Sequence, residues 1–260
     1  RYGARLEYLH VGDNSNPEVG FVRRDDFRRT SGSLRFSPRP TSMDAIRRFT
    51  YEGSLEYIEN GRGQLESRRL TGQFNIEFES SDQFEVEVND NYELLTDPFE
   101  VEDDVIIPVG GYSFKDFEVA YSLGQQRRIS GMLTLQRGEF YSGTITAATL
   151  QGARVSVLDQ LSVEPSISIN HVDLPSGEFT TKLLRARTDY AFSPRMFATA
   201  LLQFASDSHV YSSNFRFRWE YQPGSELFVV YTDERDTLGL GYPDLRNRAF
   251  VVKVNRLVRF

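Results

Sequence analysis

Apolar and polar residues alternate with a period of two along almost the whole chain, and this pattern constrains the fold more than any other feature. In one clear example, Phe215, Phe217 and Trp219 alternate with Arg216 and Arg218. Because successive side chains of a β-strand point to opposite faces, this period indicates strands with one apolar and one polar face. The i, i+3, i+4 spacing of an amphipathic helix is not sustained anywhere. We therefore predict an all-β chain.

The predicted strands are long. Their expected ranges are 2–10, 27–37, 46–59, 64–79, 83–95, 112–123, 127–137, 141–157, 160–172, 178–191, 195–206, 211–221, 225–233 and 248–260. Many exceed the roughly five or six residues of strands in soluble sheets. A tilted strand that crosses a membrane needs about 9–11 residues. The strand lengths therefore favour a membrane-spanning sheet.

The connections between these strands differ in length. Those after the fourth, sixth, eighth, tenth and twelfth strands are tight, and most contain Pro, Gly or Asp, which suit turns. Long connections cover 11–26, 96–111 and 234–247, and the connection 37–45 is a mild exception. Outer-membrane barrels have short periplasmic turns and longer external loops. We predict an up-and-down antiparallel transmembrane β-barrel of about 14 strands, or 16 in a longer parent protein.

Composition narrows the possible partners. The mean hydropathy is −0.44, and no apolar run approaches the roughly 20 residues of a membrane helix. A strand of a membrane barrel needs no such apolar run, because half of its side chains face inward and can be polar. The absence of cysteine excludes disulfides and thiolate metal sites. A net charge of −7 argues against nucleic acid as a partner. The lipid bilayer is the expected partner.

Both ends of the chain carry expectations. The sequence begins at Arg1 without a methionine or an apolar leader, so we expect a mature or excised segment. Near the other end, alternate apolar residues are expected to share the lipid-facing side, although Arg256 interrupts them: Phe250, Val252, Val254, Val258 and Phe260. A terminal aromatic such as Phe260 resembles the signal that the barrel-assembly machinery reads, which makes this machinery an expected partner.

Several motifs also resemble a known family. They are GFVRRDDFRR at 20–29, FSPRP at 36–40, NHVDLPSGEF at 170–179, YAFSPR at 190–195, and NFRFRWEYQPGS at 214–225 followed by LFVVY. Together they resemble the C-terminal barrel region of an uncharacterised bacterial outer-membrane family. Its members often carry an N-terminal module similar to family-9 carbohydrate-binding modules. The resemblance implies one outer-membrane barrel domain over 1–260, with that module before Arg1, and it supplies no catalytic residues.

The candidate site is the inward face of three predicted strands, 178–191, 195–206 and 211–221. Its expected lumen-lining residues are Arg185, Arg187, Asp189, Thr199, Gln203, Asn214, Arg216, Arg218 and Glu220. Rings of charge can set the solute preference of a pore. The same residues would also suit a fully paired network that fills the lumen, because buried charges must be paired. About 14 strands lie between filled and open barrels, so a narrow pore and a plugged lumen both stay open.

Other features favour ordinary structure over chemistry. The acidic stretch 97–104 could hold calcium, but it matches no EF-hand loop and reads better as a solvated loop. His10, His171 and His209 lie near strand ends without a hydrolase motif around them. We assign no catalytic residue, no metal and no cofactor.

The expected function is that of a porin-like channel or a membrane anchor in the bacterial outer membrane. Its solutes would be small polar molecules or carbohydrates, and the link to carbohydrate binding comes from the family resemblance. Two alternatives remain. One is an outer-membrane hydrolase that acts on lipid or glycan, and the other is a soluble β-sandwich that serves as a binding domain.

Overall fold

The computed structural model describes residues 1–14, 24–239 and 241–258, and in these residues the chain is all-β. The strands are β1 (Tyr2–Val11), β2 (Phe27–Phe36), β3 (Ile46–Asn60), β4 (Leu65–Phe78), β5 (Gln83–Leu95), β6 (Phe99–Glu102), β7 (Val105–Ile107), β8 (Gly110–Leu123), β9 (Ile129–Phe140), β10 (Gly143–Leu158), β11 (Leu161–Leu174), β12 (Gly177–Ser193), β13 (Met196–Ala205), β14 (Val210–Gln222), β15 (Ser225–Asp236) and β16 (Asp244–Asn255). None of the described residues forms a helix that is long and apolar enough to cross a membrane.

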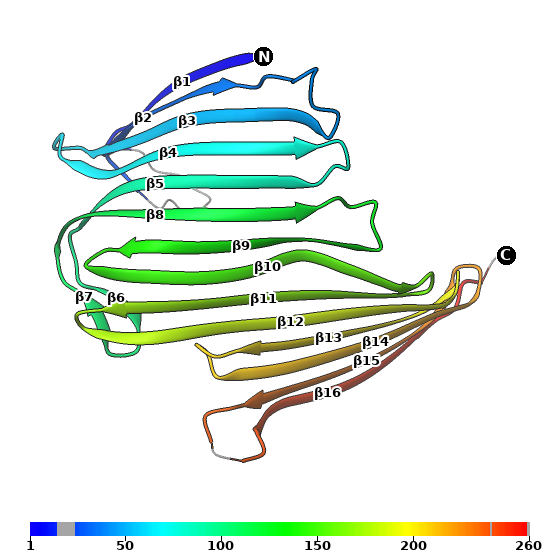
Figure 1. The fold of residues 1–260 in the computed structure, drawn as a ribbon. Coiled ribbons are helices and arrows are strands. Elements are labelled where there is room, and N and C mark those ends of the chain that lie inside the picture. Colours follow the sequence, from blue (N-terminus) through cyan, green and yellow to red (C-terminus); the bar gives the residue numbers. More distant parts are fainter. Residues whose placement is uncertain (15–23, 240, 259–260) are drawn as a thin grey trace. The chain divides into compact units, whose positions relative to one another are not determined.

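Fourteen strands belong to one sheet, in which each strand is hydrogen-bonded to its neighbours along the chain (Figure 1). The exception is a step from β5 to β8, because β6 and β7 form a separate two-stranded sheet. This order confirms the predicted up-and-down antiparallel topology and the strand number. A β-sandwich divides its strands between two packed sheets, so the order does not support the soluble-sandwich alternative. The end strands of the order are β1 and β16.

Two predicted connections are wrong in detail. The expected loop 96–111 contains the hairpin of β6 and β7, whose apolar residues pack against the strands beside it. The last strand covers 244–255 instead of 248–260, because the ladder between β15 and β16 extends to the pair Asp236 and Asp244. An ion pair of 2.6 Å between Arg246 and Asp236 holds this extension. The expected apolar face of the last strand therefore ends at Val254, and Phe260 lies outside the described residues.

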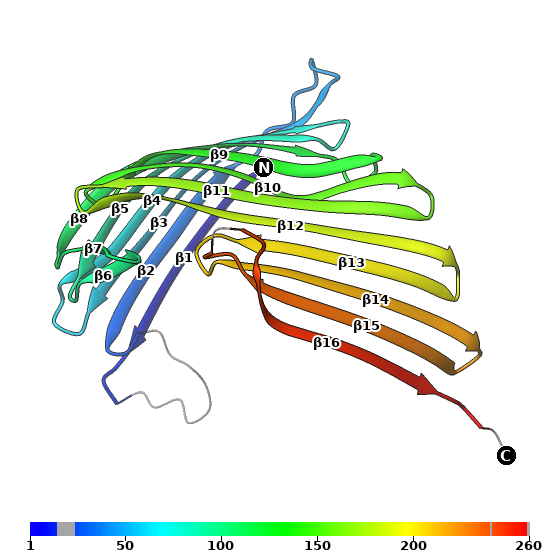
Figure 2. The same ribbon diagram turned by 90° about the horizontal axis from the view of Figure 1, so that it is seen from below.

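The chain divides into two units, and the first contains Arg1–Ser122, Thr134–Ala147 and His171–Phe179. Within it, β1 to β5 lie side by side in chain order (Figure 2). The register places Val88 opposite Gly72 and Phe117 on one face of the sheet. The next residue of β5, Asn89, lies opposite Thr71 and Asp116 on the other face. The predicted separation of apolar and polar faces is thus present in the strand register.

A buried hydrogen-bond network stiffens the polar face of the first unit. The Asp116 carboxylate accepts hydrogen bonds from Asn89 at 3.3 Å, Asn91 at 3.0 Å and Gln136 at 3.1 Å. Thr71 donates a further hydrogen bond of 2.8 Å to Asn89. Asp116, Asn89 and Asn91 are all buried. Because buried polar groups are costly when unpaired, these mutual hydrogen bonds favour one arrangement of the side chains on this face.

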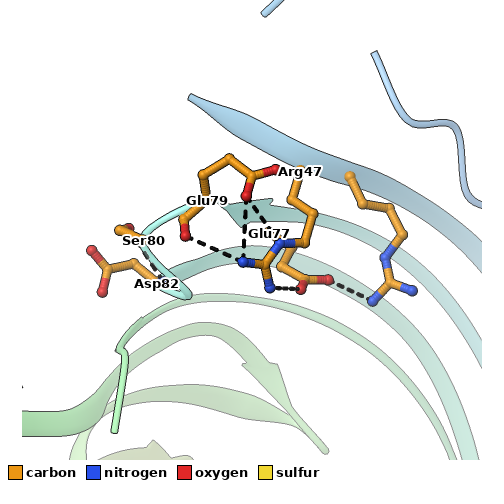
Figure 3. A network of polar contacts seen from close by, with 6 residues as sticks. Arg47, Glu77, Glu79, Ser80 and Asp82 are labelled. Carbon is orange, nitrogen blue, oxygen red and sulfur yellow. Dashed lines mark hydrogen bonds and ion pairs between the residues drawn. The ribbon is translucent and has the colours of Figure 1, made fainter. Parts of the chain in front are cut away.

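A charged cluster lies at one end of the same unit, beside the turn between β4 and β5 (Figure 3). Arg47 contacts Glu77 at 3.0 Å and Glu79 at 3.3 Å, and it also donates to the Glu79 backbone carbonyl. Arg48 forms an ion pair of 2.7 Å with Glu77. Two successive arginines can reach one glutamate because the pairing of β3 with β4 shifts between Ile46 and Arg48.

The apolar core of the first unit lies under the β6–β7 hairpin. Val105 and Ile107 of β7 are buried against Val172 and Leu174 of β11. Beside this cluster, the Tyr141 hydroxyl donates a hydrogen bond of 2.7 Å to Glu93. Burial raises the pKa of the Tyr141 phenol, and the bond to Glu93 raises this pKa further. The hairpin is therefore a packed element of the unit.

The second unit contains Leu123–Leu133, Ala148–Asn170 and Thr180–Phe260. Here β12 to β16 pair antiparallel, and the register shifts once near a strand end in three of the four pairs, at Ala191/Ser193, Glu220/Gln222 and Glu234/Arg235. The turn between β12 and β13 has two residues, 194–195, as does the turn between β14 and β15, 223–224. The connections at the opposite strand ends are longer, with 206–209 and 237–243. This unit carries the candidate site.

Candidate functional site

The strand register assembles the candidate residues into rows that cross the polar face of the second unit. One row places Thr199 between Asp189 and Arg216. The next row along the strands contains Phe197, Arg218 and its β15 neighbour Phe228. Cross-strand neighbours on one face have Cβ atoms about 4.5–5.5 Å apart, so side chains within a row can interact. The three predicted strands are thus neighbours, as the candidate site requires.

The first row is held by hydrogen bonds and one ion pair. Asp189 accepts a hydrogen bond of 2.7 Å from the Thr199 hydroxyl and forms an ion pair of 2.9 Å with Arg187. Arg216 donates from Nε to the Asn214 side chain at 2.8 Å. Asn214 donates in turn to Thr232 at 2.7 Å. These contacts fix the direction in which the Arg216 guanidinium leaves the sheet.

Arg218 combines a charged and an aromatic environment. It forms an ion pair with Glu226. Its guanidinium carbon lies 6.0 Å from the centre of the Phe197 ring and 5.8 Å from the centre of the Phe228 ring. Such distances allow cation–π attraction. The two rings form an apolar surface beside the positive charge.

These residues border a groove of about 1070 Å³, which we call the arginine groove. Its polar lining includes Arg128, Arg154, Asp189, Thr199, Arg216 and Arg218. Two backbone hydrogen bonds connect its walls, from Ser156 to Arg128 at 2.7 Å and from Ala191 to Gln160 at 2.9 Å. Four arginines and two aspartates, Asp159 and Asp189, line the groove, so its charge is net positive.

The structure brings only part of the predicted set into this groove. Asp189, Thr199, Arg216 and Arg218 line it. The others lie elsewhere on the same strands: Arg185, Arg187, Gln203, Asn214 and Glu220. Arg185 pairs with Gln203 in a more distant row, and Glu220 accepts a hydrogen bond of 3.0 Å from the Gly224 amide in a turn. That these residues line a lumen stays a prediction.

Sequence reasoning missed four important residues. Phe197 and Phe228 lie on the polar face, where their strand parity with Thr199 and Val230 could have placed them. Arg128 lies in the connection before β9, and Arg154 lies on β10, outside the three strands that formed the predicted site. Neither arginine carries a local motif, so the sequence offers no sign that they share a groove with β14.

The other sequence candidates do not form a metal centre in the described part of the chain. It contains no group of three or more His, Cys, Asp or Glu side chains that could hold a metal ion. In the acidic stretch, the Glu100 carboxylate accepts a hydrogen bond from the Asp104 amide within the β6–β7 hairpin. His10 lies in β1, His171 in β11 and His209 in the turn before β14. The hydrolase alternative therefore gains no support from a metal centre.

A second surface of interest is the apolar face of each unit, which carries large exposed side chains. In the first unit, Leu34 is 70% exposed and Val88 is 54% exposed. In the second unit, Phe250 and Val254 of β16 are 67% and 63% exposed. Large contiguous apolar patches are rare on soluble monomers and mark contact with lipid or protein.

No protein-family model matches the chain, and no curated protein sequence matches it.

Proposed function

We propose that the chain is a bacterial outer-membrane β-barrel that acts as a porin-like conduit for small polar solutes. The observation that carries this proposal is the division of the strands into a mainly apolar, exposed face and a mainly polar, charged face. A strand that faces lipid on one side and a polar lumen on the other requires this division. The fold itself is an all-β, up-and-down antiparallel sheet.

The apolar face of the first unit extends along most of the strand length that crosses a bilayer. On β4 it covers residues 70–76, which is about 20 Å at about 3.3 Å per residue. Polar groups lie near both ends of this stretch of strand. Arg68 and Lys115 pair with Asp90 at one end, and the Arg47 cluster lies at the other (Figure 3). Outer-membrane barrels carry an apolar band of about 25 Å, and this stretch would supply the greater part of the strand within such a band.

The second unit shows a similar border. Tyr231, Val229 and Leu227 follow one another on the apolar face of β15, opposite Phe250, Val252 and Val254 of β16. The next residue of this face is Asp233, which forms ion pairs with Arg235 at 2.5 Å and Arg248 at 2.9 Å. A charged group is costly at the centre of a bilayer and tolerated near the interface. The ion cluster therefore marks the expected edge of the lipid-facing band.

The charged face supports a conduit more than a simple anchor. An anchor needs only an apolar exterior, whereas the second unit presents a wide, net-positive groove on its polar side. Charged pore walls select solutes by their sign. A link to carbohydrate uptake rests on the family resemblance of the sequence motifs.

Liposome reconstitution tests the proposal. We expect the purified chain to require detergent, and we expect liposomes that contain it to swell in small sugars and planar bilayers to show stepwise conductance. Matched liposomes without protein provide the control. A monodisperse chain without detergent would contradict the membrane location. A detergent-dependent chain without flux or conductance would leave only the anchor.

A further inference from the structure

Three guanidinium groups of the arginine groove have no ion-pair partner among the residues that the structure describes. They are Arg128, Arg154 and Arg216. By contrast, Arg218 is neutralised by Glu226. Arg216 donates a hydrogen bond from its Nε to the Asn214 side chain. A guanidinium binds carboxylates and phosphates through two parallel N–H···O bonds, so the unpaired groups form a receptor for oxyanions.

The acidic residues of the groove leave this preference intact. Asp189 already accepts a hydrogen bond from Thr199 and an ion pair from Arg187. Asp159 lies in the turn between β10 and β11. The three unpaired arginines therefore outnumber the one carboxylate without an ion pair among the described lining residues.

An apolar wall adjoins the cations. Phe197 and Phe228 lie on the two sides of Arg218, and Val230 belongs to the row of Arg216. All three apolar residues are half-buried and line the groove. A small inorganic anion would leave these rings in water, whereas an organic anion could cover them and gain the free energy of apolar burial.

We infer that the arginine groove binds organic oxyanions, meaning carboxylates or phosphate monoesters that carry an apolar or aromatic group. This inference rests on the proposed function, because it names the class of solute that the conduit would take up. The groove offers the guanidinium groups of Arg128, Arg154 and Arg216 to the oxyanion, and the rings of Phe197 and Phe228 to the apolar group. The volume of about 1070 Å³ is at the upper end for small-molecule sites and accommodates such a ligand.

Calorimetric titration of the full chain, folded in detergent, tests the inference with phenyl phosphate and benzoate as probes. Benzyl alcohol serves as the neutral control, and inorganic phosphate serves as the anion without an apolar group. We expect both organic anions to bind, inorganic phosphate to bind more weakly, and benzyl alcohol to show no binding. Added salt should weaken the binding of both organic anions, because it screens exposed charges.

Variants separate this groove from general positive charge. Arg154→Gln and Arg216→Gln should each weaken phenyl phosphate binding by about tenfold, since each removes a charge-assisted contact. Arg185→Gln is the matched control, because Arg185 lies on the same face of the unit but outside the groove. It should leave binding unchanged. Circular dichroism confirms that each variant is folded.

Several results would overturn the inference. They are absence of binding by the wild-type protein, equal binding of benzoate and benzyl alcohol, equal binding of inorganic and phenyl phosphate, and an equal loss in Arg185→Gln. Bilayer conductance is measured separately. Oxyanion binding without conductance would support the groove and contradict the conduit. Conductance without binding would support the conduit and contradict the groove.

Discussion

At the scale of single residues, Asp233 is a buried charge that is held by several partners. Asp233 is 4% exposed and accepts contacts from Arg235, Arg248 and the Tyr231 hydroxyl. Removal of one partner from a buried ionic cluster leaves the others uncompensated, which costs more than the cluster itself contributes. The carboxylate therefore determines whether two arginines are tolerated at this border of the apolar face.

We predict that Asp233→Ala lowers the urea midpoint of unfolding in detergent, because Arg235 is left buried without its partner. Asp207→Ala is the control, since Asp207 lies in an exposed turn, where its carboxylate accepts a hydrogen bond from the Ser208 amide. The measurement is tryptophan fluorescence during urea titration. Equal midpoints for both variants would show that the ion cluster has no structural importance.

Tyr141 gives a prediction about pH. Its pKa is raised in the folded chain, so folding favours the protonated phenol. This contribution to stability is complete below the unfolded tyrosine pKa of about 10 and is lost as the pH rises further toward the folded pKa. We expect wild-type protein to lose stability relative to Tyr141→Phe between about pH 10 and pH 11. Urea midpoints of the two proteins at pH 8 and at these values provide the test, and a constant difference would contradict the prediction.

At the scale of elements, alternation predicted the strands well because long strands repeat the pattern many times. The expected range 83–95 coincides with β5, and the expected range 195–206 differs from β13 by one residue at each end. The β6–β7 hairpin was missed because strands of three and four residues offer too little alternation to detect. The bulge at Ile46 to Arg48 was missed because it depends on contacts with Glu77 across the sheet.

The hairpin supplies the next prediction. Ile107 is fully buried, whereas Ile106 beside it is 45% exposed. We predict that Ile107→Ala destabilises the docked hairpin by about 2–5 kcal/mol, while Ile106→Ala changes little. Limited proteolysis should then cut the connection 96–109 faster in Ile107→Ala than in wild type. If Ile106→Ala is cut as fast as Ile107→Ala, packing under the hairpin is not the cause.

At the scale of the whole molecule, the sequence predicted the division into faces but only part of the site. Strand parity suffices to place Asp189, Thr199, Arg216 and Arg218 on one face. Arg128 and Arg154 also line the groove, although they lie outside the three strands that formed the predicted site. The alternation along a strand predicts the face on which a side chain lies, but it does not predict which charged side chains from different strands line the same groove. That information comes from the strand register and the turn geometry.

A single charge on either face tests the membrane arrangement. We predict that Val86→Arg destabilises the folded protein in lipid by about 2–4 kcal/mol, because Val86 lies opposite Phe74 in the middle of the expected lipid-facing band. Gln73→Arg, which places the same side chain beside Glu87 on the polar face, should be nearly neutral. Urea unfolding in liposomes gives both values. A larger effect of Gln73→Arg would reverse the assignment of the faces.

The alternation of faces also has a consequence for how the chain folds. A slip of one residue between β3 and β4 would exchange the faces of a strand, so that Glu52 would take a place that Tyr51 or Gly53 occupies now. In lipid, such mispairing would insert a carboxylate into hydrocarbon at each repeat of the pattern. The opposed glycines Gly53 and Gly72 do not discriminate between registers, but the contacting rings of Tyr51 and Phe74 beside them do. If the chain lies in a membrane as proposed, the two-residue period would therefore disfavour misaligned hairpins during assembly.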